Sequence, residues 1–304
     1  MAKVNANKIR ESKGDVVLDV ITSIILVLIT FIVAYPVIFV ISCSFSSSKA
    51  LEAGRVVLWP VDFSLDAYKF ILNYEQVWTG FRNSIFYTIC DVFKQMTFTT
   101  LMAYPLSRRW FQGRGVYTWY FYLTGFIGGG LIPGFILKCN LGLYDNIWAV
   151  LLGGAFEMSH VLILRTAISS NIPGDLFDAA MIDGASHFQC AFRLAIPLCK
   201  ATISVLILYC IVGQWNEYFT SMLYLRNKEL YPLQLVLRPI MTAASAMNQM
   251  DTSSMPPLYQ QMANEGLEGV RYALIFVSSG PIIATYFVVQ KYFKGGMMVG
   301  SVKG

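Results

Sequence analysis

Charged residues are scarce in this sequence. Only 13% of its 304 residues are Asp, Glu, Lys or Arg, whereas 56% are hydrophobic. Soluble domains usually carry about 25% charged residues, so we expect this chain in a lipid bilayer. Its 23 Lys and Arg outnumber its 18 Asp and Glu. In a membrane protein such an excess usually lies in cytoplasmic loops, and it needs no nucleic-acid partner to explain it.

Patterns for metal binding and catalysis are missing as well. The sequence has two histidines, His160 and His187, and its six cysteines include no C-x-x-C pair, so neither a metal site nor a disulfide framework is predicted. A membrane enzyme would need converging His, carboxylate, Ser or Cys groups, and no catalytic residue is assigned. No G-x-x-x-x-G-K-S/T phosphate loop occurs. We therefore do not expect this polypeptide to bind or hydrolyse ATP.

Long apolar runs, by contrast, are abundant. Six are long enough for membrane-spanning helices, which need about 20 residues, and they cover approximately 16–44, 80–106, 116–138, 147–168, 197–225 and 271–292. The first is too long for a signal-peptide core and lacks a small-residue cleavage site, so it is interpreted as a retained span. The prediction is an all-α polytopic membrane protein with six transmembrane helices in a domain over residues 16–292.

Basic residues indicate the orientation of these spans. The tail 1–15, the loop 107–115 and the tail 293–304 are rich in Lys or Arg, which is typical of cytoplasmic segments. Both termini are therefore expected in the cytoplasm. The segments 46–79 and 224–270 are then outside, and the second of these is long enough to suggest a function.

Two spans contain unusual residues. The run 116–138 holds three consecutive glycines at 128–130 and a proline, which predicts irregular backbone that lines a passage or packs closely. Asp91 and Lys94 lie three residues apart in the second span. They are expected to form an ion pair on one helical face, and a role in a substrate path is the alternative.

A polar and acidic insert, 171–200, separates two apolar runs. Pro173 suits the first turn of a helix, and nearby acids suit the positive end of the helix dipole. We expect a short helix over about 173–183, closed by Gly184 in the left-handed conformation, and a second helix starting near Ser186. Small and acidic side chains here predict docking in a groove of another protein. An ordinary loop between helices is the alternative.

The spacing within this insert is distinctive. Asp178-Ala179-Ala180 is followed after three residues by Gly184, and after nine more by residues 194–197, Leu-Ala-Ile-Pro. This resembles the coupling loop of ATP-binding-cassette (ABC) importer permeases, whose pattern is E-A-A, three residues, G, nine residues and I-x-L-P. Asp replaces the usual Glu, and Leu and Ile are exchanged. The resemblance implies that an ATPase subunit contacts Asp178, Ala179, Ala180, Asp183 and Gly184.

A second resemblance follows the insert. Residues 213–218, Gly-Gln-Trp-Asn-Glu-Tyr, are similar to the G-x-W-N-x-F/Y segment of the carbohydrate-uptake branch of these permeases. A helix from Lys200 would place Asn216 about 24 Å further along, near the outer side of the bilayer. The side chains of Trp215, Asn216, Glu217 and Tyr218 are thus candidates for a substrate path, and interface anchoring or packing is the alternative.

The resemblance covers the whole chain and implies a type I ABC importer permease fold. The C-terminal segments 290–293 and 300–304 resemble the branch that serves oligosaccharides from complex polysaccharides, including acidic ones such as alginate. In this family a second homologous permease, two cytoplasmic ATPase subunits and an external solute-binding protein complete the importer in the bacterial cytoplasmic membrane, where it meets lipid. ATP and Mg bind the ATPase partners, so no cofactor is expected in this chain. An ion- or proton-coupled secondary transporter is the alternative function.

Overall fold

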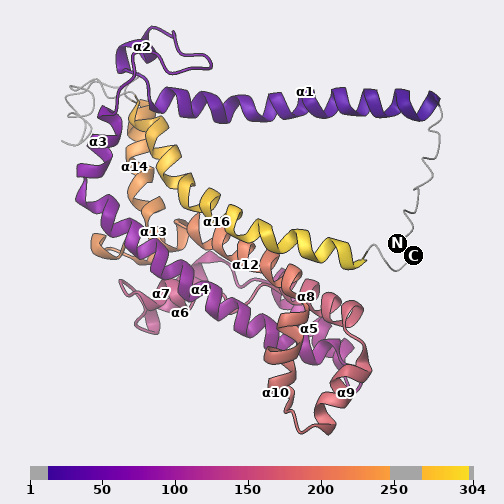
Figure 1. The fold of residues 1–304 in the computed structure, drawn as a ribbon. Helices are drawn as coiled ribbons and strands as arrows, with labels where there is room; N and C mark the ends of the chain where they lie inside the picture. Colours follow the sequence, from indigo (N-terminus) through magenta and orange to yellow (C-terminus); the bar gives the residue numbers. More distant parts are fainter. Residues whose placement is uncertain (1–12, 247–268, 301–304) are drawn as a thin grey trace. The chain divides into compact units, whose positions relative to one another are not determined.

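The computed structural model describes residues 13–246 and 269–300, which are mostly helical and form no β-strand (Figure 1). This confirms the all-α prediction for the described residues. The helices are α1 (Lys13–Ser44), α2 (Ser48–Glu52), α3 (Asp66–Asn73), α4 (Glu75–Ser107), α5 (Arg114–Phe126), α6 (Leu131–Asn140), α7 (Trp148–Leu151), α8 (Met158–Asn171), α9 (Gly174–Ile182), α10 (His187–Gln189), η1 (Cys190–Ala195, a π-helix), α11 (Ile196–Leu198), α12 (Lys200–Trp215), α13 (Phe219–Tyr224), η2 (Lys228–Leu230, a 3₁₀-helix), α14 (Leu233–Ala246) and α16 (Val270–Gly300).

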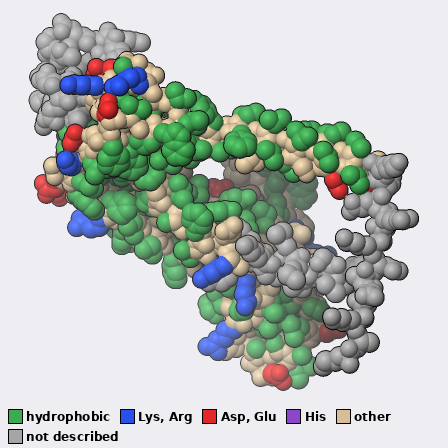
Figure 2. All heavy atoms as spheres, turned by 45° about the horizontal axis from the view of Figure 1, so that its top comes forward, with side chains coloured by type: hydrophobic (Ala, Val, Ile, Leu, Met, Phe, Trp, Pro, Cys, Tyr) green, Lys and Arg blue, Asp and Glu red, His purple; other side chains and the backbone are tan. Residues whose placement is uncertain are grey.

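The chain divides into two compact units, one of residues 1–70 and 244–276 and the other of residues 71–243 and 277–304. In the first unit, α1 is apolar on every side, and hydrophobic side chains cover its surface (Figure 2). A helix of this kind is expected where lipid surrounds it. The end of α1 packs with the segment that follows it, where the ring of Phe45 stacks on that of Tyr68 at 5.0 Å between centroids.

Two described helical stretches are long and apolar enough to cross a membrane, Gly14–Ser44 and Val270–Lys291. Two further pairs meet the same criterion only as bent spans: α5 with α6, at 99°, and His187–Leu198 with α12, at 92°. The first bend lies at the predicted glycine run. The predicted span 147–168 is not one helix, because α7 ends at Leu151 and α8 begins at Met158.

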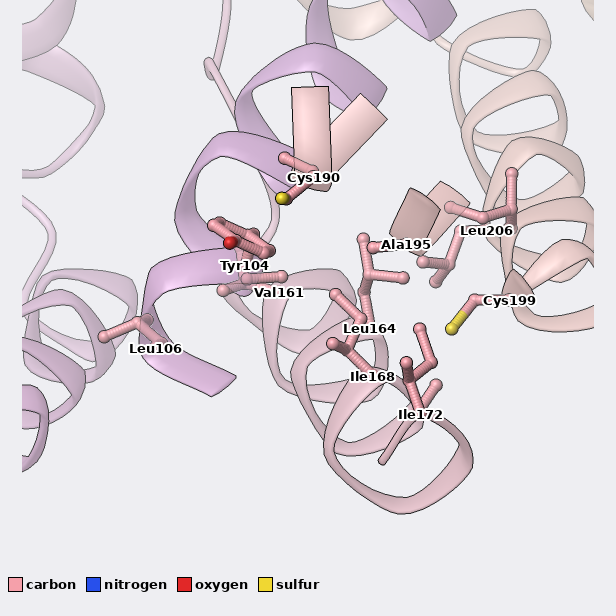
Figure 3. Close-up of a cluster of buried hydrophobic side chains, with 14 of the residues drawn as sticks. Tyr104, Leu106, Val161, Leu164, Ile168, Ile172, Cys190, Ala195, Cys199 and Leu206 are labelled. Carbon is pink, nitrogen blue, oxygen red and sulfur yellow. The ribbon is translucent and has the colours of Figure 1, made fainter. Parts of the chain in front are cut away.

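The core of the second unit lies where α4, α8, η1 and α12 pack together. Figure 3 shows this cluster, with Leu164 and Ile168 from α8 and Leu206 from α12 facing a common interior. These three side chains are at most 1% exposed. Tyr104, near the end of α4, belongs to the same cluster. The core therefore connects α4 to the segment that carries the predicted coupling insert.

The π-helix η1 links that insert to α12. The N–H of Ile196 bonds to the carbonyl of Ala191, five residues earlier. Pro197 has no N–H to continue an α-helical ladder, and the 92° bend follows before α12 begins at Lys200. Single π-turns inside helices are frequent at functional sites.

The predicted outer segment 224–270 contains more structure than the sequence indicated. The helix α14 covers Leu233–Ala246, while residues 247–268 lie outside the described part. Its beginning is held against α4, because Ser84 Oγ accepts the N–H of Leu233 at 2.8 Å. A Cβ on Gly80 would lie only 3.1 Å from Leu233 Cα, a tight contact, so glycine suits this close approach.

Asp145 connects two turns of the second unit. Its Oδ1 accepts the backbone N–H groups of Asn227 and Arg226, both at 2.8 Å. These two bonds hold the pKa of the Asp145 carboxyl below its ordinary value. The resulting stabilisation is present above the ordinary pKa of about 3.9 and is lost as the pH falls through the lowered pKa.

We predict that Asp145→Ala will speed hydrogen exchange at the Arg226 and Asn227 amides several-fold. The change removes their acceptor and places alanine at φ 54°, where Asn is tolerated better. Asp145→Asn keeps an acceptor and is the matched control. In the wild type, the protection of both amides should also fall as the pH drops below about 4, after correction for intrinsic exchange. Equal protection in the wild type and the alanine variant would contradict this role.

Candidate functional site

The insert 171–200 forms two short helices joined by a tight turn. In α9, the carbonyls of Ala180 and Met181 accept the N–H groups of Ala185 and Gly184 at 2.9 and 3.0 Å, and Gly184 has φ +86°. This is a Schellman closure, which favours glycine. Ser186 caps α10 in a reciprocal capping box with Gln189. The predicted short helices and the left-handed glycine are thus confirmed, with Pro173 at the N-cap just before α9 rather than in its first turn.

The predicted docking residues lie together on this insert. Asp178, Ala179, Asp183 and Gly184 are exposed and Ala180 is half-buried. Two large apolar side chains of the insert are exposed, Ile182 at 87% and Phe188 at 63%. Clusters of exposed apolar side chains usually mark an interaction surface. The sequence reasoning missed these two residues. Ile182 lies four residues after Asp178, a spacing that places both on one face of a helix.

Phe177 anchors α9 to the rest of the unit. Its ring is 1% exposed and lies 5.7 Å from that of Tyr104. The guanidinium carbon of Arg108 lies 3.8 Å from the centre of the Phe177 ring, a cation–π contact. Arg108 is itself only 6% exposed. Burial lowers its pKa, but a guanidinium stays charged at neutral pH. We call these three side chains the coupling anchor.

His187 extends this aromatic contact toward the loop 107–115. Its ring lies 4.8 Å from that of Trp110, and its Nδ1 lies 3.4 Å from the hydroxyl of Tyr104. No ligand role was predicted for His187, and no group of three or more possible metal ligands occurs among the described residues. Arg108 is one of the arginines from which a cytoplasmic loop was predicted, and it is buried against the Phe177 ring.

The four predicted substrate-path residues do not share one surface. Trp215 is 3% exposed, donates from Nε1 to Ser278 O at 2.9 Å and packs edge-on against Phe81. It lines an apolar crevice of about 560 Å³ between α4, α12 and α16. Asn216 is exposed and donates to Val212 O, and the ring of Tyr218 lies against Arg238. Glu217 alone of the four lines a second, polar cavity.

This polar cavity has a volume of about 530 Å³ and lies within the second unit, where α4, α6, α8 and α12 approach one another. The predicted ion pair is present at its edge, with Lys94 Nζ 2.9 Å from Asp91 Oδ1. Sequence reasoning assigned Asp91 and Glu217 but not the other lining residues, which come from separate helices. The polar and aromatic ones among these are Gln95, Lys138, Phe156, Glu157, His160, Tyr209, Cys210, Gln214 and Thr220.

We predict that Phe177→Ala will release α9 from the core. Truncating a buried Phe costs about 3–5 kcal/mol, so hydrogen exchange within α9 should accelerate by at least tenfold, with α4 little changed. Phe188→Ala, in the same insert but exposed, is the control. Arg108→Lys should give part of the same effect, because Lys lacks the planar group that stacks on the ring, and Arg109→Lys should give none. Unchanged exchange in Phe177→Ala would rule out the anchor.

Comparison with known proteins adds an independent finding. No protein-family model matches the chain. Over its whole length, however, it is 32% identical to the Bacillus subtilis protein LplC, also over the whole of that protein. It is 33% identical to the B. subtilis polygalacturonan/rhamnogalacturonan transport system permease protein YtcP, with 92% of this chain and 96% of YtcP covered.

A solved structure agrees with these relatives. It belongs to a bacterial ABC transporter involved in the import of the acidic polysaccharide alginate, and the match has a TM-score of 0.81 at 32% identity. It covers 93% of this chain and 99% of the matching one. Helical fold, spacing of the insert and full-length similarity thus lead to one assignment: the chain belongs to the permease subunits of carbohydrate ABC importers.

Proposed function

We propose that this chain forms one half of the membrane pathway of an ATP-driven oligosaccharide importer. The observation that carries the proposal is the exposed, acidic surface of α9 and its turn, tied to the core of the second unit by the coupling anchor. Such a surface suits a separate ATPase subunit whose movement is passed to the membrane helices. The contact residues proposed for it are Asp178, Ala179, Ala180, Asp183 and Gly184, extended by Ile182.

The proposed assembly follows from the family. A second homologous permease completes the pathway, two cytoplasmic ATPase subunits bind ATP and Mg, and an external binding protein delivers the sugar. We place six spans of a type I permease fold in the cytoplasmic membrane, with both termini inside. The bent pairs α5–α6 and α11–α12 and the split pair α7–α8 then count as spans, which is permissible where protein or water covers their breaks.

The substrate class is supported by the relatives. YtcP is named for polygalacturonan and rhamnogalacturonan transport, and the solved transporter imports alginate. Oligosaccharides are therefore the substrates that we propose, with fragments of acidic polysaccharides among them. In the substrate path, Glu217 is the candidate that lines the polar cavity, while the buried Trp215 lines the apolar crevice. Asn216 and Tyr218 line neither. A secondary transporter is not favoured, because none of the relatives compared above is one.

Gly184→Trp should uncouple transport from ATP hydrolysis in the reconstituted complex. Apart from its neighbours in sequence, no described residue comes within 4 Å of a Cβ placed on Gly184, so the added bulk meets chiefly the docking partner. We expect sugar-stimulated ATPase activity to fall at least tenfold. Gly142→Trp is the matched control, because Gly142 also has positive φ and open space but lies in an outer turn. Full coupling in Gly184→Trp would contradict docking at this turn.

The orientation has its own test. A cysteine at Gln112, exposed in the arginine-rich loop, should react with a membrane-impermeant thiol reagent only from the cytoplasmic side. A cysteine at Lys49, exposed at the start of α2, should react only from outside. Intact cells and inverted vesicles separate the two cases. Reaction of both positions from one side, or the reverse pattern, would remove the insert from the cytoplasm and overturn the proposed function.

A further inference from the structure

The polar cavity is built for a ligand by a fixed hydrogen-bond network on one wall. Asp91 is 7% exposed, and its two oxygens are engaged separately: Oδ1 by Lys94 at 2.9 Å and Oδ2 by the amide of Gln95 at 2.7 Å. Lys94 also donates to the carbonyls of Leu151 and Gly153. The wall is therefore neutral and held in place by α4, as a preorganised site requires.

Other groups in the cavity retain hydrogen-bonding capacity. His160 is 9% exposed, and its Nδ1 lies 3.8 Å from the sulfur of Cys210. Among the described residues, its Nε2 has no hydrogen-bond partner, and neither do the side chains of Glu157 and Gln214. All three residues line the cavity. The His160 ring is buried, where a polar atom without a partner is costly. Glu157 is exposed and Gln214 is half-buried, and all three groups are suited to hydroxyls that donate and accept.

An aromatic surface completes the site. The ring of Tyr209 is 54% exposed, lines the cavity, and stacks on the His160 ring at 6.0 Å between centroids and 13° between planes. Proteins commonly bind a small ligand that has one apolar and one polar side with an aromatic face and a few convergent polar groups. A pyranose ring has an apolar face and polar hydroxyls. The volume of about 530 Å³ lies within the usual range for small-molecule sites, roughly 300–1,000 Å³.

The charges in the cavity select between kinds of sugar. Three carboxylates line it, from Asp91, Glu157 and Glu217, and Lys138 is the one cation among its described lining residues. Lys94 neutralises Asp91 from the edge. Lys138 is already engaged by Ala149 O at 3.2 Å and by the face of the Tyr224 ring. With two lysines against three carboxylates, a free carboxylate on a ligand would meet an excess of negative charge.

Resting on the function proposed above, we infer that this cavity is a transit subsite for an uncharged sugar ring. Its hydroxyls bond to His160, Gln214 and Glu157, its apolar face lies on Tyr209, and the carboxylates disfavour a uronate. The charged groups of an acidic oligosaccharide would then be met by the other half of the pathway. Glu157 and Tyr209 are specificity-determining residues in this arrangement.

The test uses two sugars of equal shape, trigalacturonate and its fully methyl-esterified form. Uptake of each is measured in proteoliposomes that contain the whole importer, with the binding protein saturated. Glu157→Gln should raise the ratio of acidic to esterified uptake about fivefold or more, because one repelling charge is gone. Tyr209→Ala should lower uptake of both about tenfold, and Tyr209→Phe should restore most of it. Glu75→Gln and Tyr122→Ala, outside the cavity, are the controls and should change neither.

A second measurement does not depend on the binding protein. Gly213→Cys, at an exposed lining position with open space for a side chain, is labelled with a thiol reagent in the assembled complex, in a chain without its native cysteines, in the presence of either sugar. The esterified sugar should slow labelling several-fold more than trigalacturonate does. An unchanged uptake ratio in Glu157→Gln, or no protection by either sugar, would overturn the inference. If uptake still depended on ATP in that case, the proposed function would stand. A complex that hydrolyses ATP without moving any oligosaccharide would overturn both.

Discussion

The placement of the coupling insert depends on one contact, that of the Phe177 ring with the guanidinium of Arg108. A nine-residue helix such as α9 has little stability by itself, and Phe177 is its one fully buried side chain. Arg108 gives up hydration to lie on that ring, with Nε 3.2 Å from Ser107 Oγ. Ala180 and Met181 pack partly against the same core, and the other side of α9, with Asp178, Ala179 and Ile182, is left exposed.

The helix α4 carries the effect of this contact across the second unit. Its last turns contribute Tyr104 to the coupling anchor, and its middle contributes Asp91 and Gln95 to the polar cavity. A helix of 33 residues is about 50 Å long, and its interior contains no proline before Pro105. Displacement of the insert and rearrangement of the cavity wall are therefore expected to be linked through one stiff element.

The sequence predicted best what depends on neighbouring residues. Gly184 and Ser186 act within their own turns, so the closure of α9 and the cap of α10 followed from local rules. The span 147–168 was not resolved correctly, because hydropathy does not register the break between α7 and α8. Contacts between segments distant in the sequence could not be predicted from it. Nothing in the sequence around Phe177 indicates Arg108 as its partner, and nothing in the run of Trp215 and Glu217 shows that the two residues border different cavities.

The π-helix η1 has a consequence for helical phase. A π-turn is equivalent to one residue inserted in an α-helix, and each residue of an α-helix turns the chain by about 100°. The wider turn of η1 accommodates that residue locally, so deleting one residue between Cys190 and Ala195 would restore α-helical bonding and leave the flanking residues facing the same way. Inside α12, between Lys200 and Tyr209, the same deletion would turn Tyr209 and Gln214 by about 100° away from His160. A change in length is therefore expected to be tolerated in η1 and not in the helix that follows it.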